Sequence, residues 1–191
     1  MSTTSTISTP ASYFDNVLQT LQTSGFYWGA INATQSKTLL MHKHIGTFLV
    51  RASSDPKHLF TLSLRTESGV TNIRIVMNDG KFSLDQIENN GATTRPASSS
   101  QRTALRFDCV VKMLFYYMLL TRRTLRQISS NTRKRDRGLT LFLTAPLYKE
   151  VSSLQHLCRR TLNRHVIGEG VYKLPIPAKL KVYLRKYQYP L

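Results

Sequence analysis

The residue of this 191-residue chain whose position most favours chemistry is an arginine at the end of an apolar strand. Arg51 follows a run that is apolar on both sides, as in a central strand covered on each face: Gly46-Thr47-Phe48-Leu49-Val50. A guanidinium there is costly unless acceptors satisfy it, and the only carboxylate nearby is Asp55. The next loop adds donors from the hydroxyls of Ser53 and Ser54 and from backbone N–H groups. Donors around a buried cation predict an anionic ligand, and phosphate fits.

A second cation strengthens the phosphate interpretation. Arg74 lies on a neighbouring predicted strand and points opposite to Ile73 and Ile75. If Arg51 forms the floor of a deep pocket, phosphate on the long aromatic arm of tyrosine reaches it, whereas shorter phosphorylated side chains do not. One alternative stays open, in which Arg51 pairs with Asp55 or a distant acid and only holds the loop in place.

No other set of residues has the pattern of a catalytic or metal site. The histidines show no metal-ligand spacing with cysteines or acids, and we interpret them as surface residues: His42, His44, His58, His156 and His165. Cys109 and Cys158 each lie within an apolar helical pattern, which indicates buried thiols in a reducing compartment and no disulfide. We expect no enzyme activity, no metal and no cofactor.

Two short motifs near the C-terminus have the composition of a docking surface. One is a narrow apolar stripe at helical spacing, formed by Leu154, Leu157, Cys158 and Leu162. The other is Leu174-Pro175-Ile176-Pro177, for which the prolines predict an extended backbone. A segment of about forty residues buries little by itself, so the stripe packs either on the preceding domain or in a groove of a partner.

The elements that position Arg51 have the period of strands. Alternating apolar residues predict an antiparallel meander over residues 47–51, 59–65, 71–77 and 81–84, with turns at 67–69 and 78–80. A last strand is predicted over 139–143. The predicted sheet therefore brings Arg51 and Arg74 onto neighbouring strands.

Helical periodicity surrounds this sheet. It predicts helices over residues 12–23, with Ser12 as N-cap, over 34–40 and over 107–120. A polar loop at 89–101 precedes the last of these, and a basic loop at 121–138 follows it. An antiparallel meander with helices free to cover both of its faces is an α+β fold. Outside this domain, a further helix is expected to begin at Ala178.

Composition restricts the partners and the compartment. The net charge of +17 suits nucleic acid or phosphorylated protein, although a solvated basic surface explains many of the charges equally well. The densest basic run, residues 133–137, has no interleaved aromatic residues, so we interpret it as a solvated loop favouring acidic peptides. Residues 1–12 lack the features of a secretory signal, and the longest apolar run, 113–120, is too short to span a bilayer. We therefore expect a cytosolic protein.

Four segments, taken together, resemble a known family. They are Gly25-Phe26-Tyr27-Trp28-Gly29, Gly46-Thr47-Phe48-Leu49-Val50-Arg51, Phe60-Thr61-Leu62-Ser63-Leu64 and Thr71-Asn72-Ile73-Arg74. They resemble the Src-homology-2 (SH2) domain of the suppressor of cytokine signalling (SOCS) family. The resemblance implies a tail over 1–11 that is disordered, an extended SH2 helix over 12–23, an SH2 domain over 24–146 and an all-helical SOCS box over 147–191.

The resemblance also implies binding residues. Arg51, Ser53, Ser54 and Arg74 map onto the phosphotyrosine pocket of the family. Relatives commonly carry Asp where this chain has Ala52, so the loop has lost an acid that could orient its neighbours. Residues 4–10 lack the aromatic residue of the kinase-inhibitory segment of some members, which predicts absent or weak direct inhibition of Janus kinases.

The C-terminal motifs match the SOCS box in order and spacing. By resemblance, Leu154, Leu157, Cys158 and Leu162 bind elongin C, with elongin B, and Leu174, Pro175, Ile176 and Pro177 bind cullin 5. The implied function is negative regulation of cytokine receptor JAK-STAT signalling by a non-catalytic adaptor of a ubiquitin ligase, recruited to activated receptors at the inner face of the plasma membrane. Two alternatives remain, a competitor that only masks receptor phosphotyrosines and a basic nucleic-acid-binding protein.

Overall fold

The computed structural model describes residues 10–85, 105–129, 141–166 and 170–191. The chain divides into two compact units, each described below by itself. One unit is Trp28–Leu147, and the other combines Met1–Tyr27 with Tyr148–Leu191.

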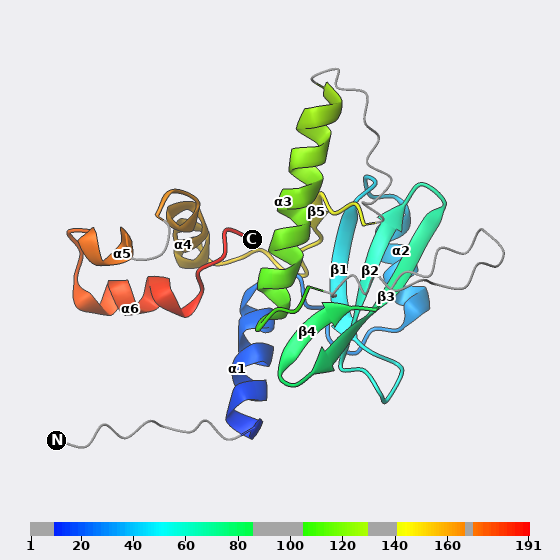
Figure 1. The fold of residues 1–191 in the computed structure, drawn as a ribbon, viewed down its shortest axis with the longest axis horizontal. Coiled ribbons are helices and arrows are strands. Elements are labelled where there is room, and N and C mark those ends of the chain that lie inside the picture. The colour runs from blue at the N-terminus through cyan, green and yellow to red at the C-terminus, as the bar shows by residue number, and fades with distance from the viewer. Residues whose placement is uncertain (1–9, 86–104, 130–140, 167–169) are drawn as a thin grey trace, which may run out of the picture. The chain divides into compact units, whose positions relative to one another are not determined.

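The unit Trp28–Leu147 is built on a five-stranded sheet in the order β4-β3-β2-β1-β5 (Figure 1). Four strands form the antiparallel meander that the sequence predicts: β1 (Thr47–Ala52), β2 (Phe60–Thr66), β3 (Gly69–Asn78) and β4 (Lys81–Leu84). The fifth, β5 (Ala145–Pro146), runs parallel to β1. The last strand was predicted at 139–143, which is the wrong position: residues 141–144 are not in a strand, and β5 begins at Ala145. Residues 139–140 lie outside the described ranges.

The register of the meander shows which side chains share a face of the sheet. Val50 pairs with Leu62, which pairs with Ile73, and all three side chains are buried. One position along, Arg51 pairs with Thr61, which pairs with Arg74. Paired residues of an antiparallel sheet point to the same face, so the two arginines lie on the same face of the sheet, with Thr61 between them.

Two helices cover this sheet, on opposite sides (Figure 1). α2 (Ala33–Met41) contacts β1, β2 and β3, and it begins with a capping box in which Asn32 and Gln35 satisfy each other's backbone N–H groups. α3 (Val110–Ser129) contacts β4 and contributes buried apolar side chains, namely Val110, Val111, Met113, Leu114 and Met118. α3 starts later and ends nine residues later than the sequence predicts, so residues 121–129 are helix and not loop.

Two glycine-containing turns shape the strands around Arg51. Gly46 has φ +86°, and a Cβ there would lie 2.6 Å from Thr144 Cγ2, so any other residue would be strained and would have to displace the Thr144 side chain. Asp79 and Gly80 both have positive φ and join Asn78 to its partner Lys81, as in a two-residue type I′ hairpin. The hairpin confirms the turn that the sequence predicts at 78–80.

The second unit is helical. Its elements are α1 (Pro10–Thr23), α4 (Leu154–His165), α5 (Gly170–Lys173) and α6 (Ala178–Lys186). The sequence predicts that the first helix begins at Ser12, but α1 begins two residues earlier, at Pro10. The start of α6 at Ala178 agrees with the prediction. Within the described ranges, no helix is both long enough and apolar enough to cross a membrane.

Candidate functional site

Arg51 is 3% exposed and makes four hydrogen bonds, all to neutral oxygens. Its Nε donates to Ser63 Oγ at 3.2 Å, and its Nη2 donates to Asn72 Oδ1 at 3.4 Å. Its Nη1 donates to the Ala52 carbonyl at 3.1 Å and to Ser54 Oγ at 3.4 Å. The guanidinium is therefore held in one orientation by β2, β3 and the loop after β1.

No carboxylate in the described part of the chain forms an ion pair with Arg51. Burial lowers the pKa of Arg51, which means that the protein penalises this charge instead of compensating it. Hydrogen bonds from a cation to neutral oxygens are weaker than those to an anion. The interpretation in which Arg51 pairs with Asp55 is therefore wrong, and the arrangement suits an anion supplied from outside.

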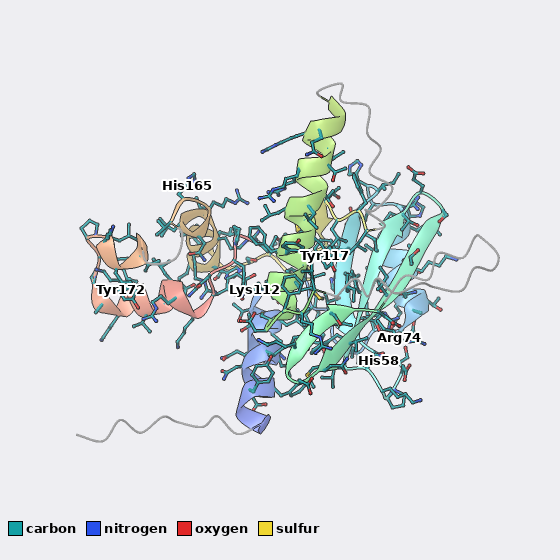
Figure 2. All side chains as sticks on the ribbon, viewed as in Figure 1. His58, Arg74, Lys112, Tyr117, His165 and Tyr172 are labelled. Carbon is teal, nitrogen blue, oxygen red and sulfur yellow. The ribbon has the colours of Figure 1, made fainter. Side chains whose placement is uncertain are left out.

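Arg74 has a different partner from Arg51. Its Nε lies 3.2 Å from Asp55 Oδ2, and His58 Nδ1 lies 3.2 Å from the same oxygen. Figure 2 shows Arg74 and His58 near each other. The prediction that His58 is an ordinary surface residue is wrong, because its side chain is only 18% exposed and contacts the acid that holds Arg74.

The structure brings together only part of the predicted set. Ser54 Oγ contacts Arg51, whereas Ser53 Oγ accepts the Asp55 N–H at 3.1 Å and so shapes the loop. Ser63 and Asn72 were not among the predicted residues, yet they bind each other at 2.7 Å and both bind Arg51. The two-residue period of the strands could have indicated them, since Ser63 lies two residues after Thr61 and Asn72 two residues before Arg74, on the face of Arg51.

The predicted apolar stripe of the C-terminal unit is exposed on α4. Leu154 is 76% exposed, Leu157 and Leu162 are each 41% exposed, and Cys158 is exposed as well. The prediction of a buried thiol at Cys158 is therefore wrong. Ser153 caps the helix by accepting the His156 N–H at 3.2 Å, which places Leu154 at the first position of α4. Leucines exposed along one helix are suited to packing against a partner.

The polar side of α4 is the side that packs within the unit. His156, Arg159 and Asn163 are buried. The Arg159 guanidinium donates to His156 Nδ1 at 2.7 Å and lies 4.3 Å above the Tyr183 ring, while Asn163 donates to the Tyr187 carbonyl at 2.6 Å. The expectation that His156 lies at the surface is wrong. Hydrogen bonds and aromatic contacts thus fix α4 with its leucines outward.

The proline-containing segment lies between α5 and α6. Leu174 and Ile176 are half-buried, whereas Pro175 and Pro177 are exposed. The backbone bends here, since the Ile176 N–H donates to the Leu174 carbonyl at 2.9 Å, so the prediction of an extended backbone is wrong. Pro177 is the N-cap of α6 and makes no side-chain hydrogen bond to the helix.

Comparisons with known proteins agree with the two units. A family model described as the SH2 domain matches residues 26–92, and one described as the SOCS box matches residues 150–185. Suppressor of cytokine signaling 3 of Gallus gallus is 38% identical over 191 residues, which is 92% of this chain and 83% of the relative. The chain belongs to the suppressor of cytokine signalling family. Suppressor of cytokine signaling 2 of Homo sapiens is 36% identical over 172 residues, which is 90% of this chain and 79% of that protein.

The Arg51 site thus lies in an SH2 domain, and the exposed stripe of α4 lies in a SOCS box. Among solved structures, the SH2 domain of a CRK/CRKL homologue from Monosiga brevicollis is similar, with 21% identity and a TM-score of 0.42 over 65% of this chain and 88% of that one. Several parts of the chain with predictions attached lie outside the described residues. They are residues 1–9 of the tail predicted to be disordered, which hold most of the region tested for a kinase-inhibitory segment, the loop at 89–101 and the basic run at 133–137.

Proposed function

We propose that this chain is a non-catalytic adaptor that suppresses cytokine signalling by binding phosphotyrosine on an activated cytokine receptor or an associated protein. The observation that carries this proposal is the buried Arg51 guanidinium, which is oriented by four neutral oxygens and has no carboxylate partner among the described residues. A phosphate group supplies the missing anion. Ser53, Ser54 and Arg74 complete the proposed pocket. Relatives named as suppressors of cytokine signaling support the pathway.

The second half of the proposal concerns the SOCS box. Leu154, Leu157, Cys158 and Leu162 bind elongin C, which brings elongin B, and Leu174 to Pro177 bind cullin 5. The exposure of the α4 leucines supports this role. The bound target is then ubiquitylated by other subunits and degraded. In this proposal residues 12–23 form the extended SH2 helix, 24–146 form the SH2 domain and 147–191 form the SOCS box. The protein is recruited from the cytoplasm to receptors at the plasma membrane.

One leucine offers a direct test of the docking surface. Full burial of a leucine contributes about 1.5–3 kcal/mol, so Leu154→Asp should abolish co-purification of elongins B and C with the full chain. Val151→Asp is the matched control, because Val151 is 96% exposed and lies just before α4. Equal co-purification by the Leu154→Asp variant and the wild type would overturn the elongin assignment.

A competitor that only masks phosphotyrosine remains the alternative. It shares the Arg51 site but needs no degradation, so the two mechanisms separate when the proteasome is blocked in cells expressing the chain. Loss of suppression supports degradation. Persistence of suppression, with Arg51 still required, replaces the ligase half of the proposal with masking.

A further inference from the structure

The two arginines on the phosphate-binding face are not equally available. Arg51 meets only neutral oxygens, whereas Arg74 is ion-paired with Asp55 at 3.2 Å. We propose that Asp55 is an internal competitor of the phosphate ligand, which occupies Arg74 in the empty site and must release it before one phosphate can bind both arginines. This inference rests on the phosphotyrosine-binding function proposed above.

The loop after β1 holds the Asp55 carboxylate in place. Asp55 Oδ1 accepts the Lys57 N–H at 3.0 Å, its own N–H donates to Ser53 Oγ, and its carbonyl accepts the His58 N–H at 3.0 Å. Its second oxygen, Oδ2, is left to face Arg74 and His58. The Lys57 hydrogen bond, followed by His58 and Arg74, holds the pKa of Asp55 below its ordinary value, so the competitor is charged at neutral pH.

The sheet register explains why one phosphate can bind both arginines at once. Arg51 and Arg74 flank Thr61 on one face, so their backbones are about two strand spacings, or about 10 Å, apart. Side chains of this length can converge on one group between them. Arg74 is 54% exposed and can therefore turn away from Asp55 without breaking the core, which the buried Arg51 cannot do.

A carboxylate beside the pocket has two effects on an arriving phosphate. It repels the dianion, and it makes the phosphate exchange an existing ion pair for a new one. Both effects weaken binding and make the contribution of Arg74 smaller than its position suggests. The opposite role, in which Asp55 positions Arg74 for the ligand, predicts changes of the opposite sign.

Phenyl phosphate separates the two roles without any choice of peptide. It is titrated calorimetrically into the full chain as wild type, Asp55→Asn, Arg74→Gln and the double variant. Asparagine keeps an oxygen for the Lys57 N–H while removing the charge. Because partly exposed ion pairs are weak, we expect Asp55→Asn to bind about two- to five-fold tighter. We also expect Arg74→Gln to cost more affinity in the Asp55→Asn background than in the wild type.

Weaker binding by Asp55→Asn, or an equal cost of Arg74→Gln in both backgrounds, overturns the inference. Asp79→Asn is the matched control for net charge, because Asp79 is 91% exposed and lies in the β3–β4 turn. Asp55→Ser repeats the measurement if Asp55→Asn does not fold. Arg51→Ala tells the two failures apart. If it binds phenyl phosphate as the wild type does, the proposed function fails, whereas lost binding with no effect of Asp55 overturns only the competition.

Discussion

The orientation of Arg51 depends on Asn72 and Ser63, two uncharged residues on neighbouring strands. Asn72 Oδ1 accepts from the guanidinium and also from the Ser63 hydroxyl, so one amide oxygen ties three strands together. Sequence reasoning found the buried arginine, since an apolar strand ending in a cation is a conspicuous pattern. It did not find Asn72, because a single polar residue on a strand is common and only the register shows what it faces.

Removing this acceptor should be costly. We expect Asn72→Ala to lower the free energy of unfolding by about 1–3 kcal/mol, because it leaves a buried cation with one acceptor fewer. Urea unfolding of the full chain measures the change. Thr71→Ala is the control, since Thr71 precedes Asn72 and points to the other face of the sheet. Equal stability of the two variants would contradict the orienting role of Asn72.

Ala52, where relatives commonly carry Asp, matters less to the orientation of Arg51 than the sequence suggests. Its backbone carbonyl accepts from Arg51, but Ala52 pairs with Phe60, so its Cβ lies on the face opposite Arg51. An aspartate at this position would therefore point away from the guanidinium. The nearby acid that does contact the pocket is Asp55, three residues later, through Arg74.

At the scale of elements, β1 depends on the glycine before it. A non-glycine residue in a left-handed conformation costs about 1–2 kcal/mol. Gly46→Ala should lower the free energy of unfolding by more than this, because the added Cβ would also collide with Thr144. Gly29→Ala is the control, since Gly29 has φ +68° but a Cβ added there would meet nothing within 4 Å. The difference between the two midpoints in urea reports the collision. No difference would mean that Thr144 turns aside freely.

From the packing of α4 we expect the C-terminal unit to lose stability in acid. Burial, followed by Arg159 and Arg160, lowers the pKa of His156 to about 4 from 6.5. Because arginine only donates, His156 Nδ1 must accept from Arg159, and a proton on that nitrogen would oppose the hydrogen bond. The unfolded chain therefore binds a proton at higher pH than the folded one, so stability present above pH 6.5 should fall as the pH drops toward 4.

This loss is measured as the urea midpoint, followed by circular dichroism, at a series of pH values. The range from pH 7.5 to about pH 4.5 spans most of the interval between the two pKa values of His156. His156→Gln removes the titrating group and should flatten the dependence of the midpoint on pH. His165→Gln, in the exposed last turn of α4, is the control and should leave the dependence as in the wild type. An unchanged slope in His156→Gln would place the sensitivity elsewhere.

At the scale of the whole molecule, the chain joins an SH2 domain built on a five-stranded sheet to a helical SOCS box. The sequence predicted the four antiparallel strands closely, because short apolar runs bounded by turn residues are a strong strand signal. It misplaced β5 and the end of α3, because a two-residue parallel strand has no periodic signal and the basic residues of α3 resemble a loop. It placed the stripe of α4 correctly but could not predict that Arg159 and His156 face inward, since that depends on tyrosines about thirty residues later.

The net charge of +17 keeps a nucleic-acid alternative in view. A nucleic-acid binder of this charge would be retained on DNA or RNA with a steep dependence on salt and without a need for Arg51. The proposed adaptor predicts the opposite, namely binding that requires the buried Arg51 guanidinium and no retention on DNA or RNA.

The most direct test is therefore calorimetric titration of the full chain with phosphotyrosyl peptides from cytokine receptors and with the same peptides lacking phosphate. Arg51→Lys keeps the charge but loses the fork of donors that binds phosphate bidentately. The account predicts binding only of the phosphorylated peptides, weakened at least about ten-fold by Arg51→Lys, since hydrogen bonds to a charged group are worth about 1.5–3 kcal/mol. Equal affinity of the wild type and Arg51→Lys for a phosphorylated peptide would contradict it.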